Sequence, residues 1–178
     1  MQIIYKHCIS LGVFLSLTIY FFNPVIFENK ELKQHDIEQW KNGANEIIDY
    51  RENTNKEALW TNSMFSGMPA YLIDVKWKND IIIFLHKLLG LWLPHPVSLI
   101  FISFISFYFM LICFGVRPEI SIFGAIAFTL STYMIVGINA GHNTRIGAAA
   151  FIPLIVAGVH LCFHKKRNLG FIITALSL

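Results

Sequence analysis

Four uncharged apolar runs constrain this chain more than any other feature of its sequence. They cover residues 8–27, 97–116, 120–138 and 146–163. A helix needs about 20 mostly apolar residues to cross the ~30 Å hydrocarbon layer of a bilayer, and each run approaches that length. The sequence therefore predicts an all-α polytopic membrane protein with four transmembrane helices.

The content of charged residues supports this prediction. Only 14% of the 178 residues are charged and 55% are hydrophobic, whereas a soluble domain carries about 25% charged residues. This composition argues against a soluble enzyme, a disordered tail and a nucleic-acid-binding protein. The three cysteines lie inside apolar runs at spacings that match neither a zinc site nor a disulfide framework, so we interpret them as small buried side chains.

A fifth apolar run opens at Gly170 and reaches Leu178 after nine residues, which is too short to span. Because a complete protein rarely ends inside a hydrophobic helix, we expect the chain to be part of a longer protein. The cations predict the orientation of the helices. Lys6, Arg117 and the cluster 165–167 fall on one side, which the positive-inside rule makes cytoplasmic. The N-terminus is then inside and the long segment 28–96 is extracytoplasmic.

That segment holds ten of the 11 acidic residues. The predicted organisation is a first transmembrane helix in 1–27, a subdomain in 28–96, and the second to fourth transmembrane helices with the start of a fifth in 97–178. Apolar residues at helical spacing predict an amphipathic helix over 36–51. Residues 59–70 should form an ordered loop, and the apolar segment 81–93 should lie along the outer membrane surface.

Asp36 is the first candidate for chemistry. It follows the first helix by about nine residues, so its carboxylate could reach the head group of a membrane-anchored substrate and accept a proton as a general base. The alternative is a helix capping box, in which Asp36 is the N-cap and Gln39 the N3 residue. Both roles are compatible with the sequence, and physics alone favours the cap.

A second candidate is the loop Gly141-His142-Asn143-Thr144-Arg145, predicted on the same face as Asp36. Arg145 could support a phosphate leaving group, and His142 adds a titratable imidazole. Alternatively, Gly141 and Asn143 make the turn while Arg145 anchors the helix at the interface. The aromatic stretch 60–71 could line a groove for an isoprenoid or a sugar, although a core or a membrane-facing belt explains it better.

Three stretches also carry a resemblance to a known family: Asp36–Trp40, Leu59–Tyr71 and Ala140–Arg145. With their order along the chain, they resemble the N-terminal part of YfhO-like bacterial membrane proteins, which look like membrane glycosyltransferases of the GT-C class. The resemblance runs from the first helix to Leu178. Family members are several times longer, so this chain alone would be inactive.

The resemblance implies a GT-C-like helix bundle in the bacterial inner membrane. It implies transfer of a sugar from a polyprenyl phosphate carrier to a cell-envelope acceptor, with no nucleic acid involved. It places the catalytic carboxylate on Asp36, with Gln39 as its neighbour. His142 and Arg145 lie near the carrier phosphate by topology, where a divalent cation could assist. The alternative from the residues is a non-catalytic membrane subunit or a lipid-carrier transporter.

Overall fold

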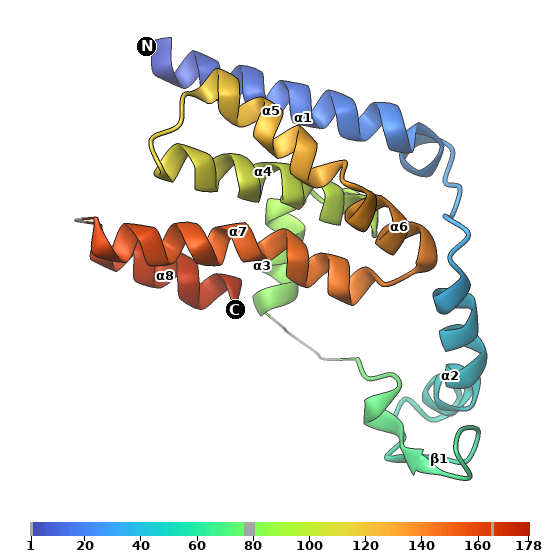
Figure 1. The fold of residues 1–178 in the computed structure, drawn as a ribbon. Coiled ribbons are helices and arrows are strands. Elements are labelled where there is room, and N and C mark those ends of the chain that lie inside the picture. The colour runs from blue at the N-terminus through green and yellow to red at the C-terminus, as the bar shows by residue number, and fades with distance from the viewer. Residues whose placement is uncertain (1, 77–80, 165) are drawn as a thin grey trace. The chain divides into compact units, whose positions relative to one another are not determined.

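The computed structural model describes residues 2–76, 81–164 and 166–178, and this part of the chain is mostly helical. It divides into two compact units, which are described separately. The bundle unit contains residues 1–32 and 82–178, and the polar unit contains residues 33–81. Figure 1 shows the helices of the bundle unit and the single long helix of the polar unit.

The bundle unit contains seven helices among the described residues. They are α1 (Gln2–Phe27), α3 (Ile81–Leu89), α4 (Val97–Cys113), α5 (Pro118–Thr129), α6 (Thr132–Ala140), α7 (Asn143–Phe163) and α8 (Arg167–Ser177). Helix α4 packs against α1, α5 and α7, while α8 packs against α7. In Figure 1 α1, α4, α5 and α7 lie roughly along one direction and α3 runs across it.

Two of the four predicted spans are confirmed by length and composition. Ile4–Phe27 of α1 and Asn143–Phe163 of α7 are long and apolar enough to cross a membrane. Helix α1 contains a kink at Phe22, next to Pro24, and still continues to Phe27. Helix α1 therefore reaches the end of the predicted apolar run 8–27.

The other two runs differ from single straight spans. Helix α4 has 17 residues, or about 26 Å at 1.5 Å per residue, which is less than the ~30 Å of hydrocarbon. The run 120–138 forms α5 and α6, which are bent by 42° and count as one span only if the pair is taken together. Ser131 is extended at the break, with ψ of 152°. The break contains the hydroxyl residues Thr129, Ser131 and Thr132. Such residues favour helix ends over helix interiors.

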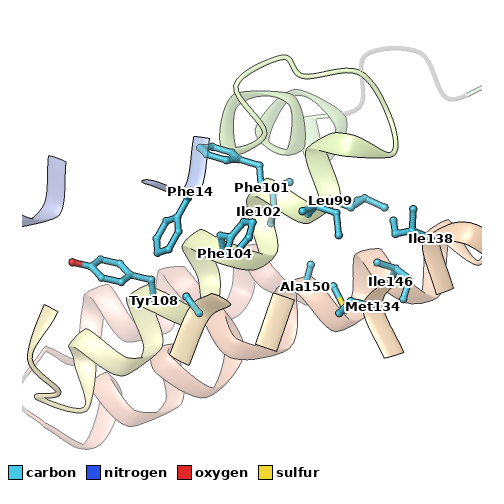
Figure 2. Packing of buried hydrophobic residues seen from close by; sticks show 12 residues of the cluster. Phe14, Leu99, Phe101, Ile102, Phe104, Tyr108, Met134, Ile138, Ile146 and Ala150 are labelled. Carbon is cyan, nitrogen blue, oxygen red and sulfur yellow. The ribbon is translucent and has the colours of Figure 1, made fainter. Parts of the chain in front are cut away.

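Helix α4 forms the centre of the bundle unit. Its first eight residues, Val97–Phe104, are all buried, which is typical of a helix covered on every side by protein. Phe14 of α1 stacks on Phe104, with ring centroids 5.2 Å apart, and meets Tyr108 edge-on at 5.5 Å. Figure 2 shows Phe14 pointing toward these two residues, and Met134, Ile138 and Ile146 gathered farther along the same core.

Small hydroxyl residues let neighbouring helices approach α4. Ser106 donates a hydrogen bond to the Ala150 carbonyl of α7, and Thr129 of α5 donates one to Ser103 at 3.1 Å. Helices α7 and α8 meet through glycines instead. A Cβ atom at Gly158 would lie 2.9 Å from the Gly170 carbonyl oxygen and closer still to Thr174. Close backbone contact through small residues is the usual way in which membrane helices associate.

The polar unit consists of α2 (His35–Thr54), a hairpin of β1 (Trp60–Thr61) and β2 (Met68–Pro69), and the 3₁₀ turn η1 (Ala70–Leu72). The amphipathic helix predicted over 36–51 is confirmed by α2, and the segment predicted as an ordered loop over 59–70 forms the two-stranded hairpin. Ala44, Ile47 and Ala70 are the fully buried apolar residues of this unit. So small a core gives little stability by itself, and polar contacts supplement it.

Two charged residues supply those contacts. Arg51, a residue that is 9% exposed, holds Glu57 through three hydrogen bonds of its guanidinium and Asp74 through one of 2.7 Å. The Glu46 carboxylate accepts hydrogen bonds from the Thr61 hydroxyl and from the Asn62 and Ser63 amides, at 2.9 and 3.0 Å for the amides. These bonds fix the hairpin and the segment at Asp74 to α2.

Candidate functional site

Asp36 lies in the first turn of α2, one residue after its start. The N-cap is Gln34, whose backbone is extended and whose side chain makes no capping bond. The capping box predicted for Asp36 and Gln39 is therefore wrong, because the chain enters the helix two residues earlier than that motif requires. A carboxylate in the first turn still interacts favourably with the positive end of the helix dipole.

The neighbours of Asp36 on α2 are polar and accessible. Gln39 Nε2 lies 2.9 Å from His35 Nε2, one helical turn back, so the amide donates to the unprotonated ring nitrogen. Trp40 donates its indole N–H to the Ile73 carbonyl at 3.0 Å, which joins α2 to the segment after η1. Asp36 itself is half-buried, whereas His35 and Gln39 are exposed. The start of α2 thus presents a carboxylate, an amide and an imidazole together.

His142 and Arg145 are brought together at the start of α7. His142 is the N-cap residue, following Gly141, which is left-handed with φ of 97° and ends α6. An Arg145 guanidinium nitrogen lies 2.6 Å from His142 Nδ1, so Arg145 donates to that nitrogen. This bond requires Nδ1 to be unprotonated, which leaves the proton of a neutral ring on Nε2. Both side chains can therefore donate toward an anion, Arg145 through its remaining N–H groups.

Tyr133 is a neighbour that the sequence did not suggest. The Arg145 guanidinium carbon lies 5.4 Å from the centroid of its ring, within the range of a cation–π contact. Tyr133 belongs to α6, and only the bend between α5 and α6 and the turn at Gly141 bring it back over α7. The tyrosine face and His142 together hold the Arg145 guanidinium in one orientation.

The cations used for orientation lie at the other end of the bundle unit. Lys6 at the start of α1 forms an ion pair of 2.6 Å with Glu119 at the start of α5, and Arg117 lies 3.7 Å from the same carboxylate. Lys166 and Arg167 follow α7, while Lys165 lies outside the described residues. The end of the bundle unit that carries Lys6 and Lys166 is therefore distinct from the end that carries Arg145. Figure 1 shows these as the two opposite ends of α7. Which end faces the cytoplasm stays a prediction.

Asp36 and Gln39 belong to the polar unit, and His142 and Arg145 belong to the bundle unit. The structure joins His142 to Arg145 by a hydrogen bond and places Asp36 and Gln39 three positions apart on α2. Within the described ranges, no group of three or more His, Cys, Asp or Glu side chains is placed to hold a metal ion. Comparison of the chain with protein-family models, with curated proteins and with solved structures finds no match.

Proposed function

We propose that this chain is the N-terminal part of a membrane glycosyltransferase with a GT-C-like bundle, which takes a sugar from a polyprenyl phosphate carrier. The observation that carries the proposal is the position of Asp36, in the first turn of a folded polar unit that follows a candidate membrane span. Nine positions separate it from Phe27. Even a fully extended chain of that length covers at most about 32 Å. The carboxylate is thus tethered within reach of a membrane-anchored substrate.

In the proposed reaction, a hydroxyl of a cell-envelope acceptor attacks the anomeric carbon of the carrier-linked sugar. The new bond joins the acceptor oxygen to that carbon, and the bond from the carbon to the carrier phosphate breaks. Asp36 takes the proton of the acceptor hydroxyl as general base. The carrier phosphate leaves with the bonding electrons, and Arg145 and His142 donate hydrogen bonds to it. Gln39 contacts the sugar.

In this proposal the general base comes from the polar unit and the phosphate-binding groups come from the bundle unit. Arg145 is suited to the phosphate because Tyr133 and His142 hold its guanidinium, so little conformational entropy is lost when an anion binds. The bacterial inner membrane and a cytoplasmic N-terminus belong to the same proposal.

The test is sugar transfer by membranes that contain the full-length protein, of which this chain is the proposed N-terminal part, with a radiolabelled polyprenyl phosphate sugar as donor. Asp36→Asn should lower the rate by at least 100-fold, since a general base contributes about 10²–10⁴. Asp49→Asn is the matched control, because Asp49 is exposed on the same helix. A folded Asp36→Asn protein that transfers sugar at the rate of the control would end the proposal for Asp36.

A non-catalytic membrane subunit or a lipid-carrier transporter is the second candidate. It is favoured by the structural use of the polar residues around the hairpin, where Glu46 and Arg51 are fully engaged in contacts within the polar unit. Movement of a labelled carrier across vesicles that contain the protein, without sugar transfer, would select this candidate.

A further inference from the structure

Two cavities of similar size adjoin in the bundle unit. One of about 370 Å³ lies between α3, α4, α7 and α8 and has an almost wholly apolar lining. The other, of about 380 Å³, lies at the corner where α3 leads into α4, and Lys87, His95 and Ser98 supply its polar lining. His86 lines both cavities, so the two lie against the same residue.

The two cavities follow one another along α4. Ser98, in the first turn of that helix, lines the polar cavity, whereas Ile102, Ile105 and Phe109 line the apolar one. The eleven residue steps from Ser98 to Phe109 correspond to about 16 Å along the helix axis. A ligand occupying both cavities would therefore have its polar end at the start of α4 and its apolar end beside the middle of the same helix.

The polar cavity has the groups that bind an anion. Lys87 provides a fixed positive charge, and the two imidazoles and the Ser98 hydroxyl provide hydrogen-bond donors. The protein packed around both rings lowers the pKa of His86 and of His95, and for His95 the charge of His86 lowers it further. Both shifts favour the neutral ring, which still donates one hydrogen bond, and Lys87 supplies a positive charge.

The apolar cavity offers almost nothing to a polar ligand. The Ser106 hydroxyl on its wall is already bonded to the Ala150 carbonyl, and the His86 ring packs beside Phe151 with centroids 5.8 Å apart. Leu154, Ile173 and Leu176 complete the far side. A cavity of this size and lining suits a hydrocarbon chain.

We propose that the two cavities form one binding site for an anionic phospholipid of the bilayer, with the phosphate at Lys87, His86 and His95 and an acyl chain in the apolar cavity. The order of the cavities along α4 matches the order of head group and chain in such a lipid. The charge of Lys87 selects an anionic head group. This site is separate from Asp36 and Arg145 and does not depend on the function proposed for them.

The experiment is native mass spectrometry of the detergent-solubilised chain with added phosphatidylglycerol. Three further probes are a diacylglycerol with the same acyl chains, inorganic phosphate and a polyprenyl phosphate. We expect one phosphatidylglycerol to bind, and Lys87→Ala to weaken it about tenfold, as expected for a lost hydrogen bond to a charged group. Lys166→Ala, which removes the same charge from the α7–α8 connection, should leave the affinity unchanged.

A second variant tests the apolar cavity. Leu154→Trp should weaken phosphatidylglycerol binding by filling the apolar cavity. If this variant has a lower melting temperature than the unmodified protein, Leu176→Trp, on the same cavity wall, is used in its place. Equal binding of diacylglycerol and phosphatidylglycerol would exclude the head-group site. Equal binding of inorganic phosphate and phosphatidylglycerol would exclude the chain site. Tighter binding of polyprenyl phosphate than of phosphatidylglycerol, or an unchanged affinity in Lys87→Ala, would also overturn the proposal.

Discussion

Within each of the two units of this protein, a different kind of contact stabilises the fold. In the bundle unit, aromatic rings, glycines and hydroxyls fit against neighbouring helices, and the charged residues lie near the helix ends. In the polar unit, Arg51 and Glu46 tie loops to α2 around a very small apolar core. Shape complementarity should therefore govern the stability of the first unit, and charge should govern that of the second.

Among the changes that test this difference between the units, loss of Arg51 should have the largest effect on stability, and it should act on the polar unit. Arg51→Met removes the partner of Glu57 and of Asp74, and loss of a hydrogen bond to a charged group costs about 1.5–3 kcal/mol for each partner. Glu57 is about one-third exposed, with a side-chain exposure of 37%, so we expect a value near the lower end. Hydrogen exchange should then rise across residues 35–76 and stay unchanged in α4 and α7.

Arg117→Met is the matched control, since the Arg117 side chain is 76% exposed. If Arg51→Met left exchange in the polar unit at the level of this control, the guanidinium would not hold that unit together.

A methyl group at Gly158 should have the next largest effect on stability, and it should act on the bundle unit. Gly158→Ala places a Cβ against the Gly170 carbonyl and Thr174. Overpacking of this kind costs about 1–3 kcal/mol. The melting temperature of the detergent-solubilised protein should fall, and α8 should become accessible to protease. Gly12→Ala is the control, because nothing lies within 4 Å of a Cβ at Gly12. Equal melting temperatures for the two variants would contradict the close contact of α7 with α8.

Low pH should have the smallest effect, and in the polar unit it should act through Glu46. The Thr61 hydroxyl and the Asn62 amide hold the pKa of Glu46 below its usual value of 4.5. A carboxyl group with a lowered pKa in the folded state contributes stability above its unfolded pKa and loses it as the pH falls through the folded pKa. Tryptophan fluorescence should therefore report loosening of the hairpin below about pH 4.5.

In Glu46→Gln, the amide oxygen can still accept a hydrogen bond but does not titrate. The loosening below pH 4.5 should be smaller in this variant. An identical acid transition in both proteins would assign it to another group.

Hydrophobic runs and helical spacing predicted most of the helices. They predicted α1, α2 and α7 because a long apolar run or a periodic apolar face is a local property of the sequence. The break between α5 and α6 was not predicted, because hydropathy is insensitive to the backbone angles at Ser131. The start of α2 at His35 was missed for a similar reason: Gln34, not Asp36, has the extended backbone of an N-cap.

The candidate site was predictable in part. His142 and Arg145 are three positions apart in one loop, and the structure joins them. Tyr133 was missed because its contact with Arg145 depends on the path of α6. The ties of Arg51 to Asp74 and of Glu46 to the hairpin were missed because they join residues 15 to 23 positions apart, a separation at which no local pattern operates.

The shortness of α4 has a mechanical consequence for a surrounding bilayer. The candidate span of α1 has 24 residues and that of α7 has 21, or about 36 and 32 Å, against about 26 Å for α4. A bilayer that matches the outer helices is thicker than the central one, and such mismatch is relieved by tilt or by local thinning. Because the first eight residues of α4 are buried among the other helices, we expect the start of α4 to be recessed from the membrane surface, with water drawn in at that point.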